Sequence, residues 1–360
     1  MLNFTPIVYN YRLLLTLALL LKSSLVCANQ GSPSPTAQQS IDNEQYTLDS
    51  QIHDCILQKL DTADENTRIL ELREICKQEI SQADPNSPLS QERSKLAKRL
   101  ISEYFDSQSR YSLIPHRRNY ILPVTYNSNP NLDTWSQLTG SRENFEELEA
   151  KYQLSTKVPL SDPLFNDRVI PYFGFTVFSL WQVYSDETSR PFRETNYIPE
   201  LFAIYKPKNN PFESSAEILF LFGVQHQSNG RNEPISRSWN RINLGVVFDW
   251  DSLVLALSPW YRLPEKNSED ENPDIEKYMG YFEVNMAYRT QNHEFSMMVR
   301  NNMFSGNGGS RGAVELGWSF PLWHRLRGYV QYFNGYGESM IDFDHSVNRV
   351  GIGLLLSDVL

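Results

Sequence analysis

Long hydrophobic runs and excess positive charge are both missing from this chain. Its longest apolar stretch, residues 13–21, is shorter than the roughly 20 residues that a membrane-spanning helix requires, so no such helix is expected. Lys and Arg number 33 against 43 Asp and Glu, which gives a net charge of -10. This balance argues against a nucleic-acid partner. Aromatic residues, by contrast, make up 12% of the chain and favour strands and membrane interfaces.

Cysteine is also scarce, with three occurrences. Arg12 precedes the apolar run and small residues follow it near Cys27, so residues 1–28 are predicted to be a secretory signal peptide. Its removal leaves Cys55 and Cys76. An oxidising periplasm would favour a disulfide between them, but a pair of small buried thiols in a helical core fits the sequence equally well.

Two patterns follow the signal peptide. Residues 29–47 are predicted to be a linker, because Gln, Ser, Pro and Thr dominate there. Residues 48–110 are predicted to be a helical N-terminal extension, because their apolar residues recur at helical spacing. The three apolar stripes are Ile52, Cys55, Ile56 and Leu60; Ile69, Leu72, Cys76 and Ile80; and Leu96, Leu100, Ile101, Tyr104 and Phe105. No arrangement of side chains in this extension predicts chemistry.

From Asn119 onwards the apolar residues recur at every second position, as they do on strands. Twelve strands are expected near residues 119–127, 145–158, 171–185, 193–206, 215–228, 237–250, 252–263, 277–290, 293–301, 311–320, 324–334 and 346–357. A soluble sandwich would also alternate, but it would need a second covering layer. An even number of strands with an apolar outside predicts an all-β fold, a twelve-stranded antiparallel transmembrane β-barrel over residues 115–360, preceded by a small α-helical periplasmic segment.

The lengths of the connections predict how this barrel is oriented. The connections after odd-numbered strands are mostly long, whereas several of those after even-numbered strands are tight; residues 158–171 and 206–215 are exceptions. Bacterial outer-membrane barrels have short periplasmic turns and longer external loops. The odd strands are therefore expected to run outwards, and the end of the fifth strand should lie near the outer leaflet.

A nucleophile, a base and an amide share the apolar face of two neighbouring strands. His226 and Ser228 continue the face that carries Phe222 and Val224, and Asn240 shares its face with Ile242. His is the usual base for a weak Ser nucleophile, and an Asn oxygen can orient its imidazole. A neutral orienting group suits this face, because an ionised carboxylate facing lipid is costly. Taken alone, an interfacial polar cluster is the commoner meaning of such residues.

The surrounding sequence changes that balance. Residues 226–241 read HQSNGRNEPISRSWNR, residues 189–197 read SRPFRETNY, and residues 270–281 read DENPDIEKYMGY; GYGES at 335–339 and NRVG at 348–351 continue the pattern. From about residue 119 to the end, the chain resembles the outer membrane phospholipase A family. The resemblance implies a twelve-stranded barrel in the bacterial outer membrane that hydrolyses both acyl esters (sn-1 and sn-2) of phospholipids, with Ser228, His226 and Asn240 as the catalytic residues.

The resemblance also implies Ca²⁺ as cofactor and a reversible homodimer as the active form. The family's calcium ligands correspond to Ser189 of one subunit and to Arg231, Ser236 and Glu271 of the other. Oxygen ligands of this kind suit calcium. Three departures concern parts other than the catalytic residues: Glu271 stands where Asp is expected, Val177 replaces an interfacial glutamine, and the chain ends in Leu360 rather than an aromatic residue.

Other interpretations of these residues remain open at this point. Ser236 and Ser238 would also suit loop caps, Arg237 and Arg241 would suit interior charge partners, and Asp270 and Glu271 would suit a solvated acidic loop. The whole chain could be a non-enzymatic barrel (a narrow pore or scaffold), or an esterase for non-lipid substrates. A pore is disfavoured because Tyr329, Phe333, Leu355 and Val247 should point inwards and fill the barrel, and the lipid-facing position of Ser228 disfavours the esterase.

Overall fold

The computed structural model describes Leu72, Ile75 and Cys76 and residues 113–357, apart from short gaps in the second range. The gaps are Asp162, residues 166–167 and 187–189, Asn209, Glu213, Ser215, Asp251, Asn267, Glu269, and residues 304–308 and 324–325. The chain divides into two compact units, residues 1–92 and residues 93–360. The predicted signal peptide and linker lie outside the described residues.

Three residues of the first unit are described, and all three are helical. Leu72 and Cys76, which belong to one predicted apolar stripe, are buried, whereas Ile75 is exposed. Cys76 is disulfide-bonded. Its predicted partner Cys55 lies outside the described residues, so the pairing itself stays a prediction.

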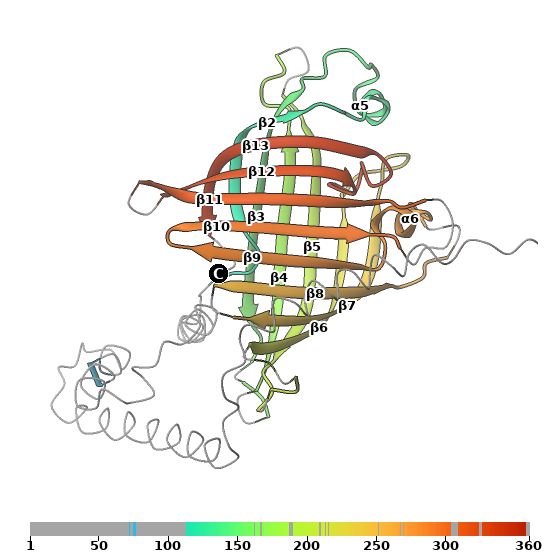
Figure 1. Cartoon of the computed structure of the whole chain (residues 1–360). Coiled ribbons are helices and arrows are strands. Elements are labelled where there is room, and N and C mark those ends of the chain that lie inside the picture. Colours follow the sequence, from blue (N-terminus) through green and yellow to red (C-terminus); the bar gives the residue numbers. More distant parts are fainter. Residues whose placement is uncertain are drawn as a thin grey trace, which may run out of the picture. The chain divides into compact units, whose positions relative to one another are not determined.

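The second unit contains a closed antiparallel barrel of twelve strands, β2 to β13 (Figure 1). Consecutive strands pair throughout, and the pairing of β2 with β13 closes the ring. Closure leaves no unpaired sheet edge, which is the condition for placing strands in lipid. The strands are β2 (Asn119–Asn127), β3 (Leu148–Pro159), β4 (Val169–Trp181), β5 (Phe192–Tyr205), β6 (Glu217–Ser228), β7 (Ser238–Asp249), β8 (Leu253–Arg262), β9 (Phe282–Thr290), β10 (His293–Asn301), β11 (Gly312–Trp323), β12 (Leu326–Tyr336) and β13 (Ser346–Ser357). The predicted fold and the number of its strands are confirmed.

The two ends of the barrel differ in the length of their connections. At one end, here called the loop end, the connections are residues 128–147, 182–191, 229–237, 263–281, 302–311 and 337–345. At the other, the turn end, they are residues 160–168, 206–216, 250–252, 291–292 and 324–325. The alternation matches the predicted one, including the two longer connections at the turn end.

Two short helices at the loop end were not predicted. Helix α5 (Leu132–Thr139) begins where the Asn131 side chain accepts a hydrogen bond from Thr134 N, and it ends at Gly140, which has a φ of 79°. Helix α6 (Ile275–Met279) occupies residues that were predicted to begin a strand at residue 277. That prediction was wrong because tertiary packing overrides the local pattern: Ile275 and Met279 are buried in a cluster with Trp239 and Trp260.

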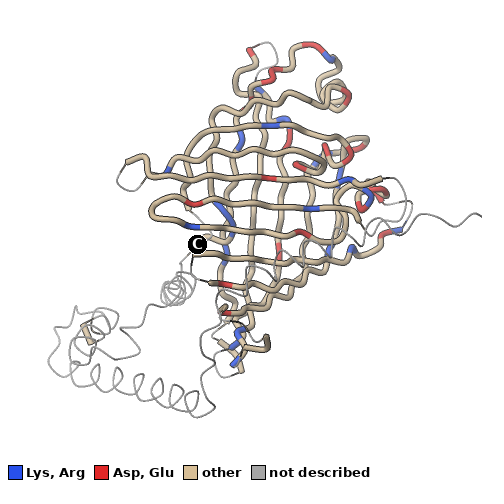
Figure 2. Tube along the Cα trace, viewed as in Figure 1, with Lys and Arg blue, Asp and Glu red and all other residues tan. Residues whose placement is uncertain are grey.

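The barrel wall is apolar outside and charged inside. Phe222 on β6 is 58% exposed and Leu244 on β7 is 53% exposed, whereas the neighbouring Gln225 and Arg241 are buried. Figure 2 shows Lys, Arg, Asp and Glu both along the strands and in the connections. Exposed apolar and buried charged side chains on one set of strands are what a hydrocarbon environment requires. Within the described ranges, no helix has the length and apolar character needed to cross a bilayer.

Side chains fill much of the barrel interior. Tyr329 and Leu355 pack with Tyr120 and Leu122 in one apolar cluster, and Phe333 belongs to a second. The inward orientation predicted for Tyr329, Phe333 and Leu355 therefore agrees with their burial, and Val247 lines the remaining cavity, which has a volume of about 540 Å³.

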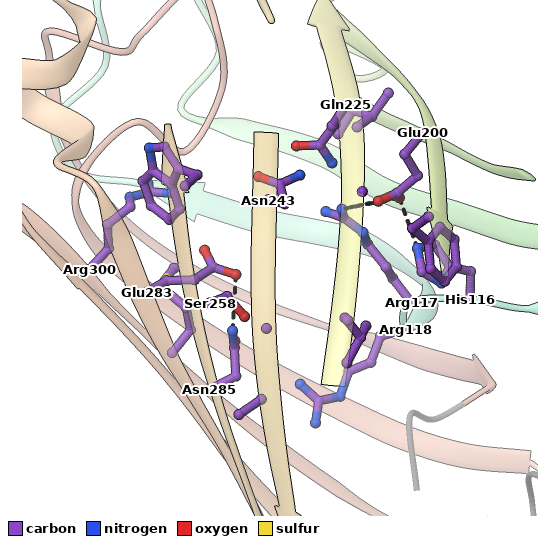
Figure 3. Close-up of a pocket in the computed structure, with 18 of the residues that line it drawn as sticks. His116, Arg117, Arg118, Glu200, Gln225, Asn243, Ser258, Glu283, Asn285 and Arg300 are labelled. Atoms are coloured by element: carbon purple, nitrogen blue, oxygen red, sulfur yellow. Dashed lines mark hydrogen bonds and ion pairs between the residues drawn. The ribbon is translucent and has the colours of Figure 1, made fainter. Parts of the chain in front are cut away.

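Polar residues from the turn end also enter this cavity. The short strand β1 (Ile114–Pro115) pairs with β3, and the chain then bends before β2 begins. His116 Nε2 and Arg117 Nη2 lie 2.8 and 3.1 Å from Glu200 Oε1, and Figure 3 shows this cluster in the cavity. Arg118 Nη2 lies 3.1 Å from Glu294 Oε1. This segment therefore lines the cavity together with the strands.

A network of buried ion pairs lies towards the loop end of the interior. It comprises Glu149, Lys151, Arg193, Glu338, Asp342 and Arg349. Lys151 Nζ and Arg349 Nε each lie 2.9 Å from one carboxylate oxygen of Glu338. Burial alone would raise the pKa of Glu338, but the Arg349 and Lys151 cations outweigh it and lower the pKa to about 2.

Candidate functional site

The predicted catalytic residues meet on the outer wall, at the loop end of β6 and β7. In the register of these strands, His226 stands opposite Asn240 and Ser228 opposite Ser238. Gln225 and Gln227 point the other way: Gln227 accepts a hydrogen bond from Trp239 Nε1 and donates one to Asn196. His226, Ser228 and Asn240 therefore share the outward face, and all three are half-buried.

The imidazole of His226 is held by the asparagine across the strand pair. His226 Nδ1 lies 2.9 Å from Asn240 Oδ1. Because a carbonyl oxygen only accepts, this hydrogen bond puts the proton on Nδ1 and leaves Nε2 free to accept one. Ser228 projects from the same face two residues along β6. Among the described residues, the structure joins His226 to Asn240, and no hydrogen bond joins the Ser228 hydroxyl to the ring.

The Asn240 amide has a second partner that the sequence did not predict. Its Nδ2 donates a 3.0 Å hydrogen bond to Glu265 Oε1, in the connection after β8. The sequence favoured a neutral group beside His226 and did not predict a carboxylate behind that group. A signal was available, because Tyr261, Leu263 and Glu265 continue the outward parity of β8, with Leu263 N bonded to Asn240 O at 2.8 Å.

Asn229 organises the connection between β6 and β7, and the sequence analysis missed this residue as well. Its buried Oδ1 accepts hydrogen bonds from Arg231 N at 3.2 Å and Arg237 N at 3.0 Å, and its Nδ2 donates to Ile235 O at 2.8 Å. These three bonds to one side chain help to fix the backbone of the connection that follows Ser228.

The predicted calcium ligands are only partly visible. Ser189 lies outside the described residues. Arg231 donates from Nη2 to the carbonyls of Phe192 and Arg193 at 2.8 and 3.1 Å, which ties the 229–237 connection to the start of β5. Ser236 lies in the same connection, where its carbonyl accepts a 2.6 Å hydrogen bond from Arg237 Nη1.

Glu271 is brought towards this connection by its neighbour. Asn272 Oδ1 accepts a 3.0 Å hydrogen bond from Ser238 N at the start of β7. Asp270 Oδ1 accepts a 2.6 Å hydrogen bond from Arg262 Nη2. The segment around Asp270 and Glu271 is therefore anchored to β8 and is not simply a solvated acidic loop. Glu271 Oε2 is buried and has no hydrogen-bond partner. No cluster of three His, Cys, Asp or Glu side chains suited to a metal was found in the described part of the chain.

The wall around Ser228 is mainly apolar and offers no deep enclosure. Tyr197 of β5 stands opposite Ser228 and is exposed, and Val177 and Leu154 continue this row on β4 and β3. The 540 Å³ cavity lies inside the barrel, where Gln225 and Arg241 line it, and so on the other face of the wall from Ser228. An apolar hollow of about 450 Å³ lies on the outer wall towards the turn end, with Phe220, Phe222 and Leu244 among its lining residues.

Comparisons with known proteins were consistent with one another. The profile of the phospholipase A1 family matches residues 96–356. A putative phospholipase A1 of Neisseria meningitidis serogroup B is 37% identical over 253 residues, which make up 68% of this chain and 65% of that protein. This chain thus spans slightly less than two thirds of that relative's length.

Two solved structures are similar over nearly their whole length. An active-site mutant of outer membrane phospholipase A from Escherichia coli, in which an asparagine is replaced by alanine, is 32% identical, with a TM-score of 0.65, and the match covers 71% of this chain and 98% of that one. The outer membrane phospholipase dimer of Salmonella typhi with bound calcium gives the same identity, TM-score and coverage.

Proposed function

Because the chain belongs to the phospholipase A1 family, we propose that Ser228, His226 and Asn240 perform its hydrolysis of phospholipid acyl esters. The fold and the relatives identify it as a bacterial outer membrane enzyme. The observation that carries the proposal is the hydrogen bond between His226 Nδ1 and Asn240 Oδ1 on the lipid-facing side of the barrel. A base oriented towards hydrocarbon suits an enzyme whose substrate is the membrane itself.

In the proposed reaction, Ser228 Oγ attacks the ester carbonyl while His226 Nε2 takes its proton. The tetrahedral intermediate collapses when the same nitrogen returns that proton to the leaving glyceryl oxygen, which leaves an acyl-serine. Water, activated by His226, then releases the fatty acid and restores Ser228. The family resemblance extends the proposal to the sn-1 and sn-2 esters and to lysophospholipids, and the open wall beside Ser228 is compatible with either ester.

Calcium is the cofactor that we propose for this site. Arg231 and Ser236 would supply oxygens from the connection beside Ser228, Glu271 would supply its carboxylate, and Ser189 of a second subunit would complete the set. The buried, unpartnered Oε2 of Glu271 supports the fit, because an orphaned carboxylate oxygen is costly unless a cation or donor satisfies it. A bound calcium ion would stabilise the negative charge that develops on the ester oxygen.

We also propose that the active species is a reversible homodimer. A single barrel offers the acyl chain only a convex wall, on which Tyr197, Val177 and Leu154 lie beside Ser228. A second barrel packed against this wall would create a groove and would bring Ser189 of the partner to the metal. Dependence on a partner and on calcium would keep the enzyme inactive in an intact membrane, whose outer leaflet the loop end is expected to face.

The test is calcium-dependent release of fatty acid from mixed phospholipid–detergent micelles by the purified protein. Ser228→Ala should reduce the rate by roughly 10⁴- to 10⁶-fold, the range for triad removal in a serine protease. The variant should keep the heat-modifiable electrophoretic mobility of a folded barrel. A folded Ser228→Ala protein with normal turnover would refute the proposed nucleophile, and wild-type protein that releases no fatty acid under these conditions would refute the function.

A further inference from the structure

The Asn240 amide is held from both sides. On one side its Oδ1 faces His226 Nδ1 at 2.9 Å, and on the other its Nδ2 faces Glu265 Oε1 at 3.0 Å. The Glu265 side chain is only 18% exposed. Its backbone is anchored two residues earlier by the bond from Leu263 N to Asn240 O, and its Oε2 lies 3.9 Å from Arg262 Nη2. This carboxylate is therefore a fixed neighbour of Asn240.

An asparagine amide can face His226 in two ways. With Oδ1 towards the ring, Asn240 accepts from Nδ1 and leaves Nε2 as the base; with Nδ2 towards the ring, it donates to Nδ1 and puts the proton on Nε2, where it blocks the reaction. An ionised carboxylate has only acceptors, so Glu265 stabilises the first arrangement and repels the Oδ1 of the second.

We propose that Glu265 is a positioning residue that sets the orientation of the Asn240 amide and, through it, the reactive tautomer of His226. The inference rests on the proposed function of Ser228, His226 and Asn240. The carboxylate also carries a negative charge, transmitted by a polar amide, that favours the imidazolium formed when His226 takes the serine proton. An extended Ser–His–Asn–Glu arrangement thus places its charge at the loop end, outside the hydrocarbon, rather than directly against the imidazole.

The elements around His226 carry other groups that titrate or are charged. Among the described residues these are Tyr197 on β5, Tyr261 and Arg262 on β8, Arg231, Glu233 and Arg237 in the 229–237 connection, and Asp270 and Glu271 in the 263–281 connection. Both loop arginines donate to backbone carbonyls, and Arg262 is paired with Asp270. Of the carboxylates, Glu265 is the one that hydrogen-bonds to the His226–Asn240 pair.

The test compares Glu265→Gln and Glu265→Ala with Asp274→Asn, measured at saturating calcium. Asp274→Asn is a matched control because this substitution removes one negative charge from the same connection. Asp274 lies on the surface, where it pairs with Lys277. Glu265→Ala should lower kcat by about tenfold, the lower end of the effect of outer partners that orient a reactive ligand. Glu265→Gln, which can still accept from Asn240, should lose less. Asp274→Asn should match the wild type.

A split between kcat and KM separates positioning from structural support. Because Glu265 contacts Asn240 and not the substrate, its variants should lower kcat and leave KM unchanged, whereas a distorted wall beside Ser228 would raise KM. Asp274→Asn should keep both values. Wild-type kcat in folded Glu265 variants would overturn the inference, even if Ser228→Ala were inactive.

A calcium titration provides the second discrimination. If Glu265 acted through the metal, its variants would need more calcium and would recover full turnover once saturated, and this result too would overturn the positioning role. An active Ser228→Ala protein would overturn the triad and this inference together. Normal folding of every variant is checked by heat-modifiable mobility.

Discussion

The two faces of strands β6 and β7 carry polar residues under opposite conditions. On the inner face, Gln225, Gln227 and Arg241 bind one another, and Arg241 lies over the rings of Trp239 and Trp260 at 4.0 and 5.2 Å. On the outer face, the polar residues of these two strands are His226, Ser228, Ser238 and Asn240. Since unneeded polar groups in lipid are costly, those that persist there indicate chemistry.

The alternation of side chains along β6 and β7 places residues that should stabilise the barrel on the inner face and the residues proposed for catalysis on the outer face. Interior polar side chains bind one another inside the barrel, and their removal should lower stability more than it affects chemistry. The outer residues have few partners: His226 has Asn240, Asn240 has Glu265, and Ser228 has none from a side chain among the described residues. Their removal should do the reverse, and each of the changes below tests one side of this contrast.

The largest effect is expected from the base on the outer face. His226→Ala should lower turnover by roughly 10⁶-fold, whereas Asn240→Ala should cost nearer 10⁴-fold, because an orienting residue contributes less than the base in the comparable protease series. Fatty-acid release by the two folded variants measures the ranking. Equal losses would contradict the assignment of Asn240 as an orienting group.

The interior counterpart is Glu338. Glu338→Ala leaves Lys151 and Arg349 with one fewer carboxylate in a buried site, and should lower the free energy of unfolding by roughly 3–5 kcal/mol while leaving turnover of the folded enzyme close to normal. Denaturant unfolding in detergent, followed by electrophoretic mobility, measures the first quantity.

The ion pairs of Glu338 should also make the free energy of unfolding depend on pH. Its folded-state pKa of about 2 lies below the ordinary value of 4.5, so its contribution is present above pH 4.5 and is lost as the pH falls towards 2. Glu338→Ala should therefore lose less stability than the wild type over that interval. An identical acid dependence in both proteins would show that the ion pairs contribute little.

A smaller effect is expected at the proposed metal site. Glu271→Ala should raise the calcium concentration for half-maximal activity by about tenfold without lowering the thermal stability of the calcium-free barrel, because the buried oxygen of Glu271 makes no hydrogen bond there.

Sedimentation in detergent with a substrate analogue should show that the dimer fraction of the wild type rises with calcium. The dimer fraction of the Glu271→Ala variant should rise only at higher calcium concentrations. Full activity from a species that stays monomeric would refute the dimer.

The smallest effect is expected from the N-terminal extension. Deleting residues 29–110 should leave phospholipase turnover in detergent within about twofold of the wild type, since the predicted helices carry no catalytic arrangement. Mass analysis of the full chain without reductant should find Cys55 joined to Cys76. Loss of turnover from an intact barrel would assign the extension a catalytic role, and a different partner for Cys76 would refute the predicted pairing.

Much of the fold followed from local pattern, and the errors have tertiary causes. The alternation of Val314, Leu316, Trp318 and Phe320 is visible without a structure, and β11 contains all four. Residues 277–281 were predicted as strand because they also alternate, but burial against Trp239 and Trp260 makes part of them a helix. The predicted turn at 321–323 instead extends β11, because pairing with β12 continues to Trp323.

The sequence by itself determined which residues face lipid. A side-chain period of two places His226, Ser228 and Asn240 on one face whatever the barrel around them, and a register slip by one residue would bury that whole face. Only the tertiary structure decided what stands behind Asn240 and which oxygen of Glu271 lacks a partner. The bond between Asn240 and Glu265 joins β7 to a connection 25 residues further along the chain. Such long-range contacts depend on packing that no local period encodes.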